Sequence, residues 1–194
     1  MADICITGLC KAYDGKPVLR DFSAVLPAGR VTGLMAPSGA GKTTLLRILM
    51  GLEQPDAGSV TGLEGRRMSA VFQEDRLCDN LDAVANIRLV TPGLARAKTL
   101  DALDAVGLGS CAGQPARELS GGMRRRVALL RALLAEYDVL FLDEPFKGLD
   151  RDTRTRVIAD TRTRCAGRTV LLVTHDAGEL DAMGVTQRLT LEMI

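Results

Sequence analysis

One short segment constrains this chain more than any other: Ala36-Pro-Ser-Gly-Ala-Gly-Lys-Thr-Thr44. An apolar run from Val31 to Ala36 precedes it, and a run with helical character, about Lys42 to Met50, follows it. A glycine-containing loop between a buried strand and the start of a helix gathers backbone N–H groups, and the helix adds its positive end. The pattern is that of a phosphate-binding loop, or P-loop, and it predicts an α/β fold.

The residue types of this loop fit the chemistry of a bound nucleotide. Gly39 and Gly41 let backbone N–H groups approach phosphate oxygens without a Cβ in the way. Lys42 supplies a mobile charge to the β- and γ-phosphates, and the hydroxyl of Thr43 suits Mg²⁺. The predicted nucleotide-binding residues of the loop are Pro37, Ser38, Gly39, Ala40, Gly41, Lys42, Thr43 and Thr44.

The first position of the loop departs from the P-loop pattern, which begins with glycine where this chain has Ala36. Alanine does not easily take a positive φ, so we expect a small backbone adjustment and no loss of binding. The alternative, a glycine-rich turn that arose by chance, does not explain why Lys-Thr-Thr is in register between a strand and a helix.

Two carboxylates follow the apolar run Val139 to Leu142. A buried strand brings Asp143 beside the P-loop, where it can hold Mg²⁺, usually through water. Glu144 points elsewhere and can polarise an attacking water. A strand capped by solvated acids is the alternative. His175, the only histidine, ends another apolar run, and it is either structural or a γ-phosphate contact that pairs with Glu144.

Length and composition limit the class of protein. The 194 residues suffice for one domain. A net charge of +1, 3% aromatic residues and no Trp give no case for nucleic acid as a partner. The N-terminus does not resemble a secretion signal, and no apolar stretch is long enough to span a bilayer. Five cysteines without a C-x-x-C pair fit a reducing cytosol.

The chain alternates β-like runs with helical runs, which predicts a single α/β domain over residues 1–194. Leu81, Val84 and Ile87 recur at helical spacing, as do later leucines, so residues 75–136 form a predicted helical insertion. Residues 1–74 and 137–194 form the predicted α/β core. The predicted strands are Ile4–Leu9, Val18–Leu26, Val31–Ala36, Ser69–Phe72, Val139–Leu142 and Val170–Val173, and a polar helix is predicted for Arg151–Cys165.

A second anion-binding segment, Leu119-Ser-Gly-Gly-Met123, directly precedes a long helix. A single nucleotide does not need two such segments. The economical interpretation is that this one covers a nucleotide held by another subunit, in a symmetric dimer that contains two ATP molecules.

These motifs, in this order, resemble the ABC ATPase family over essentially the whole chain. Tyr13 lies where family members stack an aromatic ring on adenine, and Gln73, in Val-Phe-Gln-Glu-Asp, resembles the glutamine that links Mg²⁺ and water to the helical subdomain. His175 resembles the switch histidine of the family. The residues that resemble contacts to the partner's nucleotide are Ser120, Gly121, Gly122 and, in Gly-Leu-Asp, Asp150.

The resemblance implies a P-loop NTPase (RecA-like) core with an inserted helical subdomain and an N-terminal antiparallel β part. It implies ATP and Mg²⁺ as cofactors, with Lys42, Glu144 and His175 catalytic and with Thr43, Gln73 and Asp143 at the metal. The implied partners are a second ABC ATPase subunit, as a homodimer, transmembrane permease subunits and, for an importer, a substrate-binding protein. The implied location is the cytoplasm, on the inner face of the membrane. The stretch from Val71 to Asn86 is similar to importers of the nitrate, sulfonate and taurine group.

Three features depart from the family or lie outside it. The signature ends in Met123 where Gln is usual, and Lys147 is unusual before Gly-Leu-Asp. The run Arg124-Arg125-Arg126 is interpreted as a solvated or interface face.

Other functions remain open from the sequence alone. A soluble ABC ATPase that drives assembly or remodelling would carry the same motifs. A P-loop kinase would not need the Leu119–Met123 segment. A subunit that binds but does not hydrolyse ATP would not need Lys42, Asp143, Glu144 and His175 together.

Overall fold

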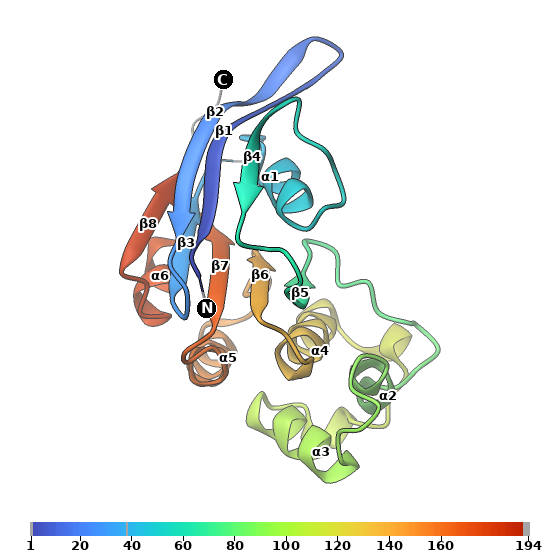
Figure 1. Ribbon diagram of the computed structural model, residues 1–194. Coiled ribbons are helices and arrows are strands. Elements are labelled where there is room, and N and C mark those ends of the chain that lie inside the picture. The colour runs from blue at the N-terminus through green and yellow to red at the C-terminus, as the bar shows by residue number, and fades with distance from the viewer. Residues whose placement is uncertain (1, 38, 192–194) are drawn as a thin grey trace.

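The computed structural model describes residues 2–37 and 39–191, which form two β-sheets (Figure 1). The five-stranded sheet has the order β5-β6-β7-β3-β8, and all its neighbouring strands are parallel. Its strands are β5 (Met68–Val71), β6 (Val139–Asp143), β7 (Thr169–Thr174), β3 (Val31–Met35) and β8 (Gln187–Thr190). The antiparallel sheet has the order β2-β1-β4 and consists of β2 (Lys16–Leu26), β1 (Ile4–Tyr13) and β4 (Ala57–Thr61).

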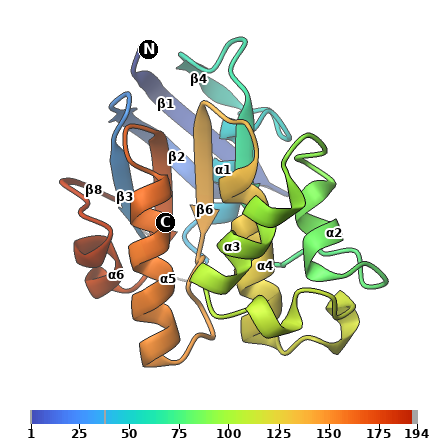
Figure 2. The same ribbon diagram turned by 90° about the horizontal axis from the view of Figure 1, so that it is seen from below.

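Helices cover one face of the parallel sheet, and the first helix together with the antiparallel sheet covers the other (Figures 1 and 2). Leu140 and Leu142 of β6 belong to a buried cluster that also contains Val127 and Val157 of the helices on one face. Phe141, between them, belongs to a second cluster with the first helix and the antiparallel sheet. The alternation follows from the two-residue period of a strand. The helices are α1 (Lys42–Leu49), α2 (Ala83–Arg88), α3 (Arg96–Ala105), α4 (Gly121–Leu134), α5 (Arg151–Arg164) and α6 (Ala177–Ala182).

Helices α2, α3 and α4 lie in the chain between β5 and β6 and gather beside the β5 edge of the sheet (Figure 1). Asn86, fully buried in α2, organises the turn before that helix. Its side-chain amide donates to the carbonyls of Cys78, Leu81 and Asp82 at 3.0–3.1 Å, and its Oδ1 accepts from the N–H of Cys78 at 2.8 Å. Helix α4 contacts both α2 and β5, so it joins this helical part to the sheet.

The predicted fold class is confirmed: a parallel core, an antiparallel N-terminal part and a helical insertion are all present. The sequence prediction missed β4 and β8, two short strands that lack a run of apolar residues, and the six-residue helix α6. Strand β1 continues past the predicted end at Leu9 because the polar segment up to Tyr13 still pairs with β2. Of the helices in the described part of the chain, none is both long and apolar enough to cross a membrane.

Candidate active site

A cavity of about 620 Å³ lies at the carboxyl ends of β3, β6 and β7, the place where parallel α/β sheets bind ligands. It brings together five of the predicted P-loop residues, Asp143 at the end of β6, Glu144 directly after that strand, and the histidine after β7. Pro37 and Ala40 are not part of its lining. Its lining consists of Val18, Gly39, Gly41, Lys42, Thr43, Thr44, Gln73, Asp143, Glu144, Lys147 and His175.

The P-loop ends at Gly41, which caps α1 with a φ of 87°. A Cβ at this position would lie 2.8 Å from the carbonyl oxygen of Val18, so both the backbone conformation and the space require glycine. The cap residue offers no side-chain acceptor, so the first N–H groups of α1 remain directed at the cavity. Ser38, one of the predicted loop residues, lies outside the described residues.

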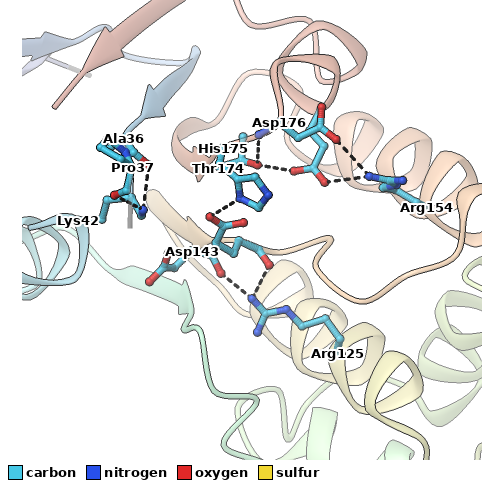
Figure 3. A network of polar contacts seen from close by, with 11 residues as sticks. Ala36, Pro37, Lys42, Arg125, Asp143, Arg154, Thr174, His175 and Asp176 are labelled. Atoms are coloured by element: carbon cyan, nitrogen blue, oxygen red, sulfur yellow. Dashed lines mark hydrogen bonds and ion pairs between the residues drawn. The ribbon is translucent and has the colours of Figure 1, made fainter. Parts of the chain in front are cut away.

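Ala36 is buried and does not take a positive φ, so the loop begins without the strain that an alanine would suffer there. The side chain of Lys42 folds back over this part of the loop (Figure 3). Its Nζ donates to the carbonyl oxygens of Ala36 at 2.9 Å and of Pro37 at 2.8 Å. The ammonium group therefore lies at the loop before any phosphate arrives.

The two acids that end β6 have different environments. Asp143 is 5% exposed and lies in register with Val173 of β7. Burial raises the pKa of its carboxyl and the charge of Glu144 raises it further, whereas Arg125 and Lys42 oppose that rise. Glu144 has a φ of 49°, in the left-handed region that a side-chain-bearing residue seldom adopts. The carboxylate of Glu144 contacts His175, which follows β7.

His175 and Glu144 meet at the mouth of the cavity. Nδ1 of His175 lies 2.9 Å from Oε1 of Glu144 (Figure 3). The hydrogen bond to Glu144 and the negative charge of that residue raise the pKa of His175. The imidazole is 70% exposed, so the side of the ring that faces away from Glu144 remains open to a ligand.

Residues on both sides of His175 are fixed by a polar network (Figure 3). The hydroxyl of Thr174 donates to Oε2 of Glu179 at 2.6 Å and accepts from the N–H of Asp176 at 3.1 Å. Arg154 of α5 lies 3.1 Å from the Asp176 carboxylate and 3.8 Å from that of Glu179. Burial raises the pKa of Glu179, which is 6% exposed. The network holds the turn that carries His175 against α5 and α6.

The predicted metal-binding residues Thr43, Gln73 and Asp143 all line the same cavity. They offer a hydroxyl, an amide oxygen and one carboxylate, a donor set that fits Mg²⁺ because this ion keeps several waters and also binds substrate phosphates. Among the described residues no group of three or more His, Cys, Asp or Glu side chains could form an all-protein metal cage.

The second predicted anion-binding segment lies outside this cavity. Ser120 caps the N-terminus of α4, and its Oγ accepts from the N–H of Met123 at 3.4 Å. Gly122 packs against the backbone of Gly148, since a Cβ at Gly122 would lie 3.4 Å from that carbonyl oxygen. Asp150 caps α5 in the same way, with Oδ1 3.0 Å from the N–H of Thr153. The four predicted trans contacts therefore lie on two adjoining helix starts, apart from the chain's own P-loop.

Tyr13 also lies outside the lining of the cavity, at the end of β1. Its side chain is 41% exposed, and its hydroxyl donates to Oε1 of Glu53 at 2.5 Å. That hydrogen bond is the main reason why the pKa of Tyr13 is raised. Thr44 of α1 also interacts with the phenol, so the ring lies next to the start of the phosphate-binding helix.

Sequence reasoning missed several residues at the site. Val18 lines the cavity from β2, and only the fold of the antiparallel sheet reveals this. Lys147 is unusual before Gly-Leu-Asp, but the sequence does not predict that it lines the cavity. From the sequence, the arginine run is interpreted as a solvated or interface face. Arg125 is not solvated: it is 4% exposed and donates to the backbone of both acids.

Comparisons with known proteins identify the family and the fold of this chain. A sequence model described as "ABC transporter" matches residues 19–147. The chain is similar to the aliphatic sulfonates import ATP-binding protein SsuB 1 of Rhodococcus jostii, with 44% identity over 90% of this chain and 73% of that protein. It is 41% identical to the aliphatic sulfonates import ATP-binding protein SsuB of Pseudomonas putida, over 95% of this chain and 70% of the relative.

A solved dimeric structure of a bacterial ABC transporter cassette has the same fold, with a TM-score of 0.86. The two chains are 24% identical, and the match covers 97% of this chain and 94% of the other. The predicted resemblance is thus confirmed by the family match and by the identity to curated relatives. The chain belongs to the ABC transporter family and is one of its ATP-binding, ATP-hydrolysing subunits.

Proposed function

We propose that this chain hydrolyses ATP in the cavity between the P-loop and the ends of β6 and β7, and that it thereby drives an importer whose membrane-spanning permease is a separate chain. The observation that carries the proposal is the convergence of Lys42, Asp143, Glu144 and His175 on one cavity. These four residues come from three separate segments of the chain, and a phosphate-binding loop alone does not require the Glu144–His175 pair.

In this proposal the P-loop binds the phosphates of ATP. The N–H groups at the start of α1 face the cavity and the helix end is positive, so both attract the β-phosphate. Lys42 exchanges the carbonyl oxygens of Ala36 and Pro37 for phosphate oxygens, which are stronger acceptors because they carry charge.

Thr43, Gln73 and Asp143 would hold Mg²⁺ in this proposal, Asp143 usually through water. The ion neutralises part of the charge on the β- and γ-phosphates when it is bound. Arg125 and Lys42 lower the pKa of Asp143 against the effects of burial and of Glu144, which favours the ionised form that a metal needs.

Glu144 is the residue that orients the attacking water and accepts its proton. His175 holds Oε1 of Glu144 at 2.9 Å, so the second carboxylate oxygen is left for the water. The exposed side of the imidazole is available for the γ-phosphate. The network of Thr174, Glu179 and Arg154 keeps the histidine turn at this distance from β6.

The proposal includes a dimer in which Ser120, Gly121, Gly122 and Asp150 contact the ATP held by a second copy. Two observations support it: these residues lie outside their own chain's cavity, and the two helix starts that carry them adjoin each other at Gly122 and Gly148. A helix N-terminus with a capping serine and two glycines can accept a γ-phosphate from a facing subunit.

The transported substrate is inferred from the relatives, which are named as import ATP-binding proteins for aliphatic sulfonates. We infer an organic anion of this class as the cargo. We also infer a membrane-spanning permease, to which this chain binds on the cytoplasmic side, and a separate substrate-binding protein. The alternative, a soluble ATPase that remodels other proteins, has no support among these relatives.

Reconstitution tests the proposal. The chain is placed in vesicles with the permease subunits that co-purify with it and with their substrate-binding protein. We expect phosphate release from MgATP to rise when an aliphatic sulfonate is added, and uptake to stop in a Lys42→Ala variant. Phosphate release without any sulfonate uptake would contradict the import function but not the ATPase activity.

A further inference from the structure

The arginine run that follows the Ser120–Gly122 segment does not form one surface. Arg124 reaches Asp79 at 2.8 Å, and Arg126 reaches the carbonyl of Val106 at 2.7 Å, so both bind within the helical part of the chain. Arg125 points the opposite way, into the interface between α4 and the parallel sheet (Figure 3). It is 4% exposed, and a buried guanidinium is costly unless acceptors surround it. Both terminal nitrogens of Arg125 find acceptors, whereas its Nε has none among the described residues.

One arm of this guanidinium binds the segment that follows β5. Nη1 of Arg125 donates to the carbonyl oxygen of Phe72 at 2.5 Å and, at 3.4 Å, to that of Gln73. The same atom lies 3.1 Å from Oδ1 of Asp75, a largely buried carboxylate that balances the charge. The backbone of the proposed metal contact Gln73 is therefore tied to α4.

The other arm binds the end of β6. Nη2 of Arg125 donates to the carbonyl oxygen of Asp143 at 2.5 Å and to that of Glu144 at 2.7 Å, and both bonds are buried. The planar fork of arginine suits this arrangement because its two nitrogens can serve two chain segments at once. Through Arg125, α4 holds both segments in one geometry.

The backbone conformation of Glu144 makes it depend on such contacts. Its φ of 49° is unfavourable for a residue with a side chain, so the surrounding structure has to hold it. Its N–H donates to the carbonyl of Val173 at 2.9 Å, and its own carbonyl accepts from Arg125 and from the N–H of Lys147, the latter at 3.2 Å. Arg125 supplies the only side-chain donor among these three bonds.

We propose that Arg125 is a positioning residue for ATP hydrolysis: it fixes the backbone of Asp143 and Glu144 and that of the Gln73 segment from the helix whose first turn faces the partner's nucleotide. The inference rests on the proposed roles of these acids and of Gln73. This arrangement has a mechanical consequence. If α4 moves relative to the sheet, the segment after β5 and the end of β6 must move with it, or the hydrogen bonds of the Arg125 guanidinium must break. The start of α4 and the water-polarising residue Glu144 are therefore coupled directly.

The same helix offers a matched control. Arg131, six residues further along α4, donates to the carbonyls of Arg76 at 2.8 Å and Asp75 at 3.0 Å. It thus binds the loop after β5 with the same chemistry as Arg125, but its hydrogen bonds do not reach β6. A change at Arg131 removes an arginine–carbonyl contact and leaves Asp143 and Glu144 supported.

The test compares Arg125→Gln, Arg125→Lys and Arg131→Gln with the unchanged chain. Equilibrium binding of ATP, KM and kcat for MgATP, and the folded fraction by near-ultraviolet circular dichroism are measured for each. We expect Arg125→Gln to bind ATP within about twofold of the unchanged chain and to lose kcat by roughly 10- to 100-fold, as misplaced catalytic groups do. Arg125→Lys keeps the charge beside Asp75 but has no fork, so an intermediate kcat is expected.

Arg131→Gln should keep kcat within about twofold of the unchanged chain, as expected for a residue that does not support the acids. Equal losses of kcat in Arg125→Gln and Arg131→Gln, or a loss that only follows the folded fraction, would overturn the inference. If Arg125→Gln does not fold, Arg125→Lys decides, and an unchanged kcat in that variant overturns it. The proposed function is judged separately, by whether the unchanged chain hydrolyses ATP and Glu144→Gln does not.

Discussion

Nδ1 of His175 lies 2.9 Å from Oε1 of Glu144, although 31 positions separate the two residues in the chain. The pairing follows from the sheet, because β6 and β7 are parallel neighbours and Asp143 is in register with Val173. The residues that follow these two strands therefore emerge side by side at the same edge. Neither residue would find the other without this register, so the contact reports directly on the assembled core.

The protonation of His175 can be followed through one set of imidazole NMR signals, since it is the only histidine of the chain. The hydrogen bond to Glu144 raises its pKa above the usual value of about 6.5. Protonated His175, paired with Glu144, therefore stabilises the folded chain fully at a pH below the pKa of this histidine in the unfolded chain. The stabilisation is lost as the pH rises through the higher pKa of His175 in the folded chain. Proton NMR should show a raised pKa in the unchanged chain and one closer to 6.5 in Glu144→Gln. The same pKa in both would contradict the pairing.

Tyr13 provides a test of the predicted adenine contact that separates its ring from its hydroxyl. The hydroxyl binds Glu53, so Tyr13→Phe loses this bond but keeps the aromatic face. Stacking is worth about 0.5–1.5 kcal/mol beyond the buried area, so Tyr13→Ala should weaken ATP binding roughly 2- to 12-fold. Tyr13→Phe should bind ATP nearly as well as the unchanged chain, and both should keep kcat at saturating ATP. Equal ATP affinity in all three proteins would exclude the stack.

Alanine substitutions at two P-loop glycines should differ in their effect on the free energy of unfolding. Gly39 and Gly41 both have a φ above 80°, but a Cβ at Gly39 meets no atom within 4 Å, whereas one at Gly41 lies 2.8 Å from the Val18 carbonyl. Gly39→Ala should therefore cost only the backbone penalty of about 1–2 kcal/mol in the free energy of unfolding. Gly41→Ala should cost clearly more, because β2 or the loop must shift. Urea unfolding measures both, and equal losses would show that the loop relaxes freely.

The trans contact is tested by charge at the cap of α4. Asp and Asn both replace a capping serine well, so Ser120→Asp and Ser120→Asn keep the helix start and differ mainly in charge. In a Glu144→Gln background with MgATP, the Asp variant should fail to dimerise because its carboxylate repels the partner's γ-phosphate. The Asn variant should still dimerise, and both should bind ATP as monomers. Dimerisation of the Asp variant at the level of the Asn variant would show that this segment does not meet a phosphate.

The sequence predicted the parts of the site that depend on short contiguous patterns. The P-loop, the acids at the end of β6 and His175 could be placed because each of them comes at the end of an apolar strand. The end of the apolar run in the sequence shows where the strand ends. Val18 and Lys147 were not placed, since their positions in the cavity depend on how β2 and the turn after β6 pack. The charge pattern around Arg125 resembles that of a solvated helix face, and only the docking of α4 on β6 reveals that it is buried.

Ala36, which stands where the P-loop pattern has glycine, shows a second limit of prediction from the sequence. The sequence predicted a backbone adjustment from the difficulty of a positive φ, and the structure avoids that conformation at this residue. The Ala36 carbonyl serves instead as an acceptor for Lys42, a role that any residue could supply. Short strands such as β4 and β8 escaped prediction for a related reason: their pairing partners, and not their own composition, make them strands.

Sedimentation velocity of the Glu144→Gln variant, with and without MgATP, shows whether two subunits share each bound ATP and whether Glu144 is needed to hydrolyse it. Loss of a general base lowers turnover by about 100- to 10,000-fold, so bound ATP should persist in this variant. We expect a monomer without nucleotide and a dimer with MgATP, because each ATP then joins two subunits and binding is linked to association. A monomer under both conditions, together with wild-type phosphate release, would contradict both the role of Glu144 and the shared nucleotide.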